Sequence, residues 1–458
     1  MSDIEEIASR TGAEIGRAYR AGEADPVAVT ECLLSRIAAA EGDHIFITVS
    51  ADRALAEAKA ASRRHKEGRP LSALDGVPIA WKDLFDVAGT PTTAGSLVFG
   101  RDTKARDLAC VSHAAAAGLV TMGKVNMSEL AYSGLGLNPH FGTPRNPNDK
   151  ATLRSPGGSS SGSGAAVGAR LVPLAIGSDT GGSVRIPAAF NGVVGFKTST
   201  GRIEADGIVP LARTYDTIGP LARSVEDCVL VDMALRGAVA TEVRRADTAA
   251  LTVLVPTNIV LDGVSDAVAA NFERTLGALS AAGVTVRHAH VDALHAILAL
   301  NAAHGTLTAA EAYTEYREIV DGEKGRSIDR RVTKRIMDGK RMSAHDVLTI
   351  QRERRRLITA FENQLGDAIL VMPTTPITAP AVAPLEADDD LFHKVNLTAL
   401  RNTMLGNILD LCGVAVPNGR DGDGLPTSIL FSAPHGADER LLGVALAVEG
   451  IVADAAAR

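Results

Sequence analysis

The sequence contains few aromatic residues and few cysteines. Phe, Trp and Tyr make up 3% of its 458 residues, so Ala, Val, Leu and Ile must build most of the core and of any pocket. The four cysteines stand far apart and form no Cys-x-x-Cys pair. This spacing argues against a disulfide framework or a thiolate zinc site, and it fits a reducing compartment. They are Cys32, Cys110, Cys228 and Cys412.

Long apolar segments and an excess of basic charge are also missing. No run approaches the ~18 consecutive apolar residues that a membrane span requires. The N-terminal MSDIEEIASR has neither the basic region nor the apolar run of a signal peptide. The formal net charge of -7 gives no general attraction to nucleic acid or to acidic membranes. We therefore expect a cytoplasmic protein that binds neither nucleic acid nor membranes.

Predicted strands and helices alternate along the chain. Hydrophobic residues amount to 46%, which is enough for a sizeable core. Apolar positions recur at helical spacing in residues 1–70 and through most of 293–366, and a further helix is expected to begin near Asn126. Short apolar runs at 76–81 and 171–176 are typical of buried strands. This alternation predicts an α/β fold with a partly parallel sheet.

A glycine- and serine-rich tract, SPGGSSSGSG, occupies residues 155–164. Such composition is most often a flexible linker. This tract, however, runs directly into the apolar AAVGARLVPLAIG, and a second cluster, GSDTGGSVR, follows at 177–185. Ser159 and Ser183 lie on these two stretches, so the tract is interpreted as part of a site that needs bare backbone and hydroxyl groups.

Lys82 is placed at the end of the apolar run GVPIAW. An ammonium group there would be desolvated, which favours the neutral amine and lowers the pKa. A neutral lysine is a competent general base near neutral pH. The alternative is a structural ion pair between Lys82 and Asp83 or Asp86 at the strand end.

Two segments together resemble the amidase signature family. Residues 157–203, GGSSSGSGAAVGARLVPLAIGSDTGGSVRIPAAFNGVVGFKTSTGRI, resemble the family's signature, and residues 76–96, GVPIAWKDLFDVAGTPTTAGS, resemble its lysine segment. The resemblance covers nearly the entire chain and is weakest at about 240–345. Further stretches follow in the family's order: KVNMSEL, GTPRNP, GPLARSVED, MPTTPITAP and LPTSILFSAP.

The resemblance implies a Ser–Ser–Lys catalytic triad. In this sequence Ser183 would be the nucleophile, Ser159 the bridging serine and Lys82 the base. It also implies a cis peptide bond between Gly158 and Ser159. The backbone N–H groups that could stabilise an oxyanion belong to Thr180, Gly181, Gly182 and Ser183.

The resemblance also suggests roles for residues around the triad. Asp179 and Arg185 would brace the nucleophile loop. The alternative, an ordinary buried ion pair between them, is nearly the same claim. Ala131 and Ser133 would line the acyl pocket together with Ser159, although a packed helix explains the stretch NMSELAYS equally well. The chemistry needs neither a metal nor an organic cofactor.

The implied fold is one large domain over residues 1–458, a central mixed β-sheet with helices on both faces. Residues 1–70 would form an N-terminal helical segment, 76–203 the catalytic core, and 290–345 a variable helical region that selects the substrate. The arginine-rich stretch 330–356 contains interspersed acids and no stacking aromatics, so it is interpreted as a solvated helical face.

The implied activity is hydrolysis of a C–N bond in a small carboxamide, anilide, or carbamate- or urea-type substrate. One alternative is the catalytic component of a tRNA-dependent amidotransferase, which would act as a glutaminase together with partner subunits. Another is a non-enzymatic scaffold on an inactive amidase fold, against which the intact Lys82, Ser159 and Ser183 argue. The family suggests a homodimer.

Overall fold

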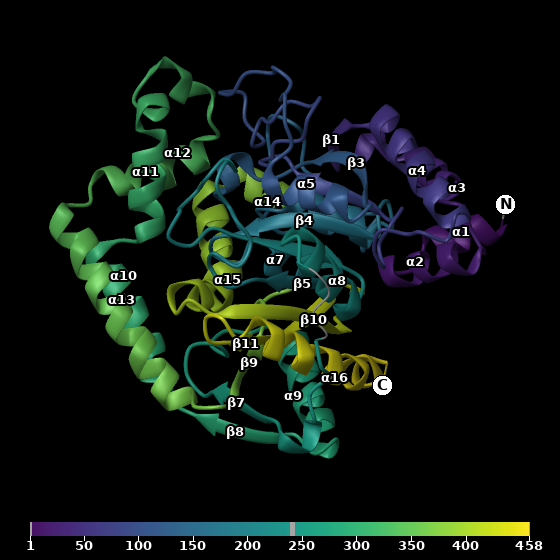
Figure 1. The fold of residues 1–458 in the computed structure, drawn as a ribbon. Coiled ribbons are helices and arrows are strands. Elements are labelled where there is room, and N and C mark those ends of the chain that lie inside the picture. The colour runs from purple at the N-terminus through teal and green to yellow at the C-terminus, as the bar shows by residue number, and fades with distance from the viewer. Residues whose placement is uncertain (1, 239–242, 458) are drawn as a thin grey trace.

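A mixed sheet of eleven strands crosses the part of the chain that the structure describes, residues 2–238 and 243–457 of a computed structural model (Figure 1). The strand order is β1-β3-β2-β4-β6-β5-β10-β11-β9-β7-β8. The strands are β1 (Phe46–Val49), β2 (Pro78–Lys82), β3 (Val120–Val125), β4 (Leu174–Asp179), β5 (Val194–Lys197), β6 (Thr217–Ala222), β7 (Thr252–Pro256), β8 (Thr285–Ala289), β9 (Ile369–Pro373), β10 (Cys412–Arg420) and β11 (Pro426–Ala433).

Parallel pairing is confined to two parts of this sheet. Strands β3, β2 and β4 run parallel to one another, as do β9, β7 and β8, and the remaining neighbours are antiparallel. Every residue of β2, β3 and β4 is buried. Strands covered on both sides read as continuous apolar runs, which explains why PIAWK and LAIGSD lack the polar alternation of a surface strand.

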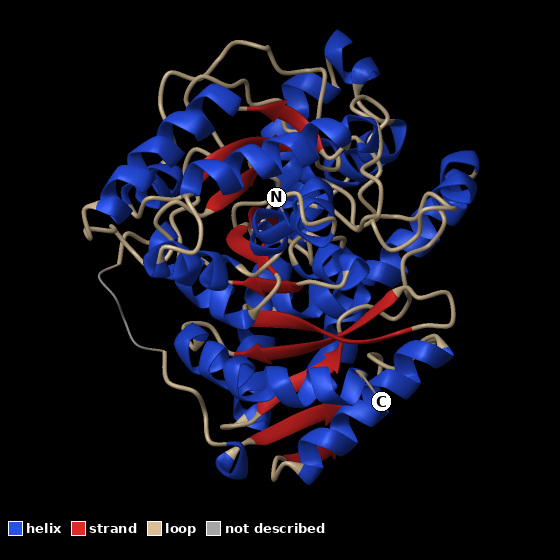
Figure 2. Cartoon of the chain, turned by 90° about the vertical axis from the view of Figure 1, so that its right-hand side faces the viewer, coloured by secondary structure: helices blue, strands red, loops and turns tan. Residues whose placement is uncertain are grey.

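Helices cover both faces of the sheet, as Figure 2 shows with the strands between two helical layers. This confirms the expected single α/β domain. The helices are α1 (Ser2–Ala8), α2 (Gly12–Ala21), α3 (Pro26–Ala39), α4 (Ala51–Lys66), α5 (Ala109–Ala116), α6 (Ser161–Gly168), α7 (Arg185–Asn191), α8 (Val225–Leu235), α9 (Asp266–Ala281), α10 (Asp292–His304), α11 (Leu307–Val320), α12 (Arg330–Lys340), α13 (Ala344–Leu365), α14 (Val382–Ala387), α15 (Asp389–Ile408) and α16 (Asp438–Ala456).

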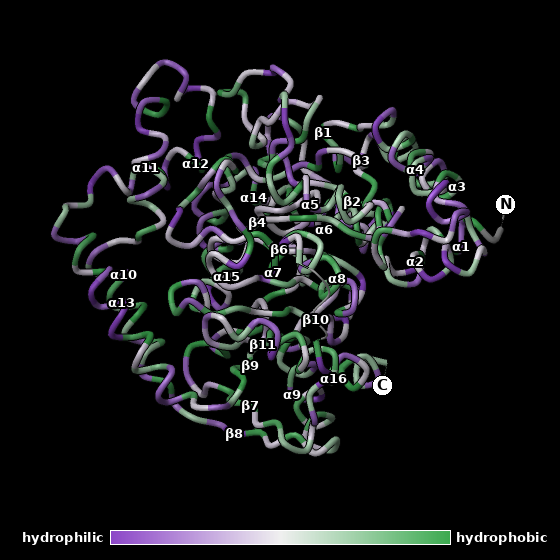
Figure 3. The backbone as a smooth tube through the Cα atoms, in the orientation of Figure 1, coloured by the Kyte–Doolittle hydropathy of each residue, from purple (hydrophilic) through white to green (hydrophobic). Residues whose placement is uncertain are grey.

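Helices α10 to α13 form an arm along one side of the molecule (Figure 1). Within it α11 packs on α12 and α10 packs on α13. Hydrophilic stretches are frequent along these helices, whereas the central strands are largely hydrophobic (Figure 3). Of the described residues, no helix has the length and apolar character to cross a bilayer.

Two expectations about the N-terminal third need correction. Residues 1–70 are mainly helical, but they also contribute β1, which pairs with β3. No helix begins near Asn126. Asn126 instead accepts a hydrogen bond from the N–H of Met127 (2.7 Å), and Leu130 and Ala131 have positive φ values of 51° and 58°. These left-handed residues limit the segment to one 3₁₀ turn, Glu129–Ala131.

Candidate active site

The site forms where neighbouring parallel strands end. Lys82 is the last residue of β2, and Ser178 and Asp179 end β4, which runs parallel beside β2. The carboxyl ends of parallel strands meet at one edge of a sheet, where ligand sites of α/β proteins commonly form. Helix α6 connects the tract to β4 and packs on β2, β3 and β4, so its N-terminal end brings Ser159 to the same edge.

Lys82 contacts two serine hydroxyls. Its Nζ lies 2.7 Å from Ser159 Oγ and 2.7 Å from Ser178 Oγ, and the lysine is fully buried. The alternative in which Lys82 pairs with a neighbouring aspartate is wrong. Asp83 pairs instead with Lys124 (2.9 Å), and Asp86 pairs with Lys104 (3.3 Å).

The electrostatic surroundings of Lys82 favour the neutral amine. Burial lowers the pKa of Lys82 to about 7, while the carboxylates of Asp216 and Asp179 act in the opposite direction. Desolvation exceeds these attractions because hydroxyl groups, and not carboxylates, are the direct partners of the amine. A large fraction of Lys82 therefore carries a free lone pair at neutral pH.

The glycine-serine tract is packed into the core and does not act as a tether. The Gly158–Ser159 peptide bond is cis. The N–H of Gly158 donates to the carbonyl of Gly134 (2.8 Å), and the carbonyl of Ser159 accepts from the N–H of Ser128 (3.0 Å). A Cβ at Gly158 would lie 2.5 Å from the carbonyl oxygen of Ser133. The tract contains only small residues at these positions because other backbone segments occupy the space that larger side chains would fill.

Ser183 lies on the loop between β4 and α7, and the carboxylate of Asp179 organises this loop. Its Oδ1 accepts from the N–H of Gly182 (2.8 Å) and its Oδ2 from the N–H of Val184 (3.0 Å). Arg185 pairs with the same carboxylate at 2.9 Å. Burial opposes ionisation of Asp179, but Arg185 and nearby donors outweigh it and hold its pKa well below the usual range. The loop therefore folds around a buried anion.

Three of the four expected oxyanion donors are free. Gly182 donates to Asp179, as described, whereas the N–H groups of Thr180, Gly181 and Ser183 have no acceptor among the described residues. The hydroxyl of Thr180 donates to Asp216 Oδ1. Burial raises the pKa of Asp216 to about 6.

Comparison with known proteins agrees with this geometry. The Amidase family model matches residues 28–442 of the chain. The chain belongs to the amidase family. It is 34% identical to mandelamide hydrolase of Pseudomonas putida, over 93% of this chain and 88% of the relative. It is also 34% identical to a glutamyl-tRNA(Gln) amidotransferase component of Azotobacter vinelandii, over 95% and 96%. A crystal structure of an amidase superposes with a TM-score of 0.85 at 28% identity, covering 97% of this chain and 99% of that one.

The chain is accordingly a hydrolase that acts on carbon–nitrogen bonds. A cavity of about 290 Å³ reaches the Ser183 loop of this amidase. The core contributes Ala131, Ser133, Thr180, Gly181 and Ser183 to its wall. Ser159 is fully buried and lies outside this wall.

The opposite wall of the cavity comes from the helical arm. Leu298 and Asn301 of α10 and Arg335 of α12 face it, together with Leu397 and Leu400 of α15. Most of this wall is aliphatic, as the scarcity of aromatic residues suggests. The arm thus lies against the same cavity as Ser183.

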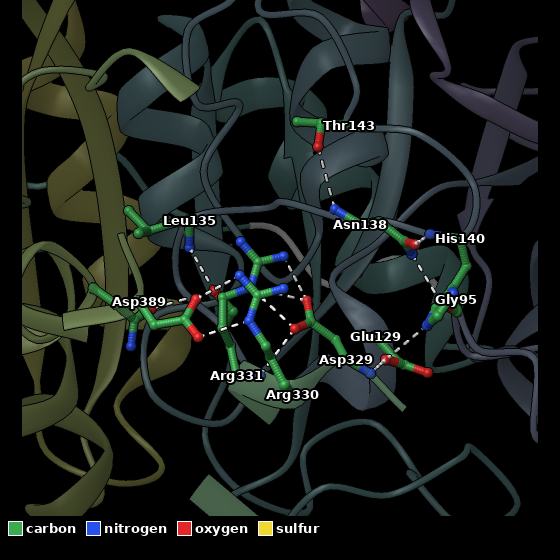
Figure 4. A network of polar contacts seen from close by, with 12 residues as sticks. Gly95, Glu129, Leu135, Asn138, His140, Thr143, Asp329, Arg330, Arg331 and Asp389 are labelled. Atoms are coloured by element: carbon green, nitrogen blue, oxygen red, sulfur yellow. Dashed lines mark hydrogen bonds and ion pairs between the residues drawn. The ribbon is translucent and has the colours of Figure 1, made fainter. Parts of the chain in front are cut away.

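Glu129 connects the core to the start of α12, where Figure 4 shows it beside Asp329. Its carboxylate accepts from Ser96 Oγ (2.5 Å) on the core side and from the N–H of Asp329 (2.6 Å) at the start of α12. Asp329 in turn pairs with Arg331 (2.6 Å). These contacts of Glu129 fix the start of α12 relative to the 3₁₀ turn that carries Ala131.

The arginine-rich stretch 330–356 is not simply a solvated face, which corrects the expectation from its composition. Arg331 is buried, Arg335 faces the cavity, and Arg354 lies over the ring of Tyr215 at 5.0 Å. A helix rich in charge exposes every side chain only when nothing packs on it, and here α11 packs on α12 while Phe392 and Tyr132 lie against two of its arginines.

Sequence reasoning also missed Ser178 and Asp216. Ser178 directly precedes DTGGS at the carboxyl end of a buried strand, so its position was a usable signal. Asp216 is separated from Thr180 by 36 positions, and local sequence gives no sign of that contact.

Proposed function

We propose that this amidase hydrolyses the C–N bond of a small carboxamide, anilide, or carbamate- or urea-type substrate through an acyl-enzyme on Ser183. The observation that carries the proposal is the 2.7 Å separation between Lys82 Nζ and Ser159 Oγ in a site that favours the neutral amine. A serine hydroxyl needs a neighbour that accepts its proton during attack. Lys82 and Ser159 can provide that acceptor.

The proton would pass through Ser159. Neutral Lys82 can donate to Ser178 while its lone pair accepts the proton of Ser159, which in turn accepts the proton of Ser183. The N–H of Ser160 donates to the carbonyl of Ser183 (3.2 Å), which ties the two serine-bearing segments together. Ser183 Oγ then bonds to the carbonyl carbon of the substrate.

The remaining steps return the proton and release the enzyme. The N–H groups of Thr180, Gly181 and Ser183 face the negative oxygen that forms, and one such donor commonly supplies about 3–4 kcal/mol. The C–N bond breaks as the proton travels back through Ser159 to the leaving nitrogen. Water then hydrolyses the acyl-enzyme and frees Ser183.

Covalent labelling tests this assignment. A fluorophosphonate should add one adduct at Ser183, located by mass spectrometry, and the wild type should hydrolyse members of a panel of amides, anilides, carbamates and ureas. Ser183→Ala should lose both labelling and turnover. Lys82→Ala should lose most turnover, with the remainder rising at high pH.

Ser161→Ala is the matched control for these variants. Ser161 lies in the same buried tract, and its hydroxyl has no hydrogen-bond partner among the described residues. It should retain labelling and turnover. Full activity in Ser183→Ala or in Lys82→Ala would refute the assignment.

A glutaminase that works within a larger assembly is the second candidate, because the Azotobacter vinelandii relative matches the chain over nearly its full length. In that case the site would release ammonia from glutamine for a partner protein. Gel filtration combined with a glutaminase assay separates the two. Glutaminase activity that appears only after such a partner is added would favour this candidate.

A further inference from the structure

Two cavities adjoin one another beside the helical arm, and one of them reaches Ser183. The cavity that reaches Ser183 has a volume of about 290 Å³, and an outer cavity of about 440 Å³ adjoins it. Tyr132, Asn301 and Arg335 belong to the walls of both. These residues therefore surround the passage through which a substrate would reach Ser183.

Arg335 is a cation at this junction with no anionic partner. Its Nη1 donates to the carbonyl of Tyr132 (2.8 Å), and its guanidinium lies over the Tyr132 ring at 4.1 Å from the ring centre. Among the described residues no carboxylate lies within ion-pair distance of Arg335, and its other nitrogens have no acceptor. The contacts with the ring and with the backbone carbonyl of Tyr132 together hold the guanidinium at this junction.

The other basic side chains named at the outer cavity already have carboxylate partners. Arg341 forms an ion pair with Asp338, and His304 lies 2.8 Å from Asp346. Both side chains therefore have a carboxylate partner within the protein, whereas Arg335 has none among the described residues. The positive charge at the junction thus belongs to one side chain.

A second donor at the junction also lacks an acceptor. Asn301 Nδ2 is buried and has no hydrogen-bond partner among the described residues. Burial lowers the pKa of Arg335, although a guanidinium stays charged under all ordinary conditions. Buried polar groups are normally satisfied, so Asn301 Nδ2 is an exception, and Arg335 is a half-buried cation that no carboxylate pairs among the described residues. Two unsatisfied donors on one cavity wall indicate a ligand that brings acceptor oxygens.

We infer that the substrate of this amidase carries a carboxylate, which Arg335 binds while the amide carbonyl lies at Ser183. This inference rests on the proposed hydrolysis of a small amide. The planar guanidinium can donate two parallel hydrogen bonds to a carboxylate, and Asn301 supplies a further donor. The aliphatic wall at Leu298 and Leu400 suits the short carbon chain between the two groups, as in a monoamide of a dicarboxylic acid.

Paired substrates test the inference. Succinamate and butyramide have similar length and the same primary amide, but only succinamate has a carboxylate. We expect kcat/KM to be at least tenfold higher for succinamate. Arg335→Gln should reduce the succinamate-to-butyramide ratio of kcat/KM by about 10- to 100-fold, chiefly through KM, and Arg335→Lys should restore part of it.

Lys334→Gln is the matched control. Lys334 precedes Arg335 on α12, its side chain is 58% exposed, and it lies outside both cavity walls. The control removes the same charge from the same helix and should leave the ratio unchanged. A ratio that Arg335→Gln leaves unchanged, or that Lys334→Gln lowers equally, overturns the inference.

A binding measurement separates this inference from the proposed reaction. Calorimetry with Ser183→Ala protein measures succinamate affinity without turnover, and Arg335→Gln in that background should weaken it at least tenfold. Lack of succinamate binding overturns the inference even if neutral amides are hydrolysed. Binding that depends on Arg335 supports it even if Ser183 fails to react with a fluorophosphonate, an outcome that counts against the proposed reaction alone.

Discussion

Gly181 and Gly182 are neighbours on the loop that carries Ser183, yet the structure constrains them differently. Gly182 has a φ of +132°, and a Cβ there would lie 2.1 Å from Thr403 Oγ1. At Gly181 the nearest heavy atom would be Leu400 Cδ2, at an ordinary contact distance of 3.7 Å. The same substitution, Gly→Ala, should therefore disrupt the loop at one position and be accommodated at the next.

The expected cost at Gly182 has two parts. A side chain in this region of positive φ costs about 1–3 kcal/mol, and an extra methyl group in a filled space costs about 1–3 kcal/mol more. Thr403 cannot simply turn away, because its hydroxyl donates to the carbonyl of Gly181 (2.8 Å). The sum of about 2–6 kcal/mol is a large part of the ~5–15 kcal/mol that stabilises a typical protein.

Thermal unfolding and fluorophosphonate labelling of Ser183 measure the outcome. Gly182→Ala should lower Tm by several degrees and suppress labelling, because the Ser183 loop must shift. Gly181→Ala should keep the wild-type Tm and lose activity only toward substrates that fill the cavity beside Leu400. Adding Thr403→Ala to Gly182→Ala should recover the part of the loss due to the clash. A Gly182→Ala protein with wild-type Tm and wild-type labelling would refute this reasoning.

Two further predictions concern charge. The value of kcat/KM should fall as pH drops through about 7, because protonation of Lys82 removes the lone pair that accepts the proton. The Asp216 carboxylate favours the ammonium form of Lys82, so Asp216→Asn should move this fall to lower pH. A pH–rate profile of both proteins tests the two predictions. Asp179→Asn leaves the buried Arg185 without its anion and should cost about 3–5 kcal/mol in chemical unfolding. Asp389→Asn breaks a largely exposed ion pair and should cost less than about 1 kcal/mol, so equal losses in the two variants would contradict the argument.

The fold class could be predicted from the sequence because buried strands such as β2 and β4 are short apolar runs that begin close to a glycine or proline. It also singled out Lys82, since a lysine that ends such a strand must be desolvated. The 3₁₀ turn at Glu129–Ala131 could not be read in the same way, because two non-glycine residues adopt left-handed conformations there. The position of Arg335 at the cavity could not be predicted for another reason. Whether a cation in a charged helix faces solvent or a cavity depends on which element packs on that helix, and no local pattern encodes this.

Burial alone would not have distinguished Lys82 from other lysines. Three lysines are buried in the described part of the chain, Lys82, Lys124 and Lys197, and burial lowers the pKa of each. Lys124 is paired with the carboxylate of Asp83, which favours its charged form. Lys197 donates to two backbone carbonyls, which have no proton to give. A general base needs both a free lone pair and a partner with a transferable proton. Lys124 also contacts a hydroxyl, Thr92 Oγ1 (3.2 Å), but it is held by a carboxylate as well. Of the three, Lys82 alone combines hydroxyl partners with no direct carboxylate partner, so its contacts, rather than its burial, support the role proposed for it.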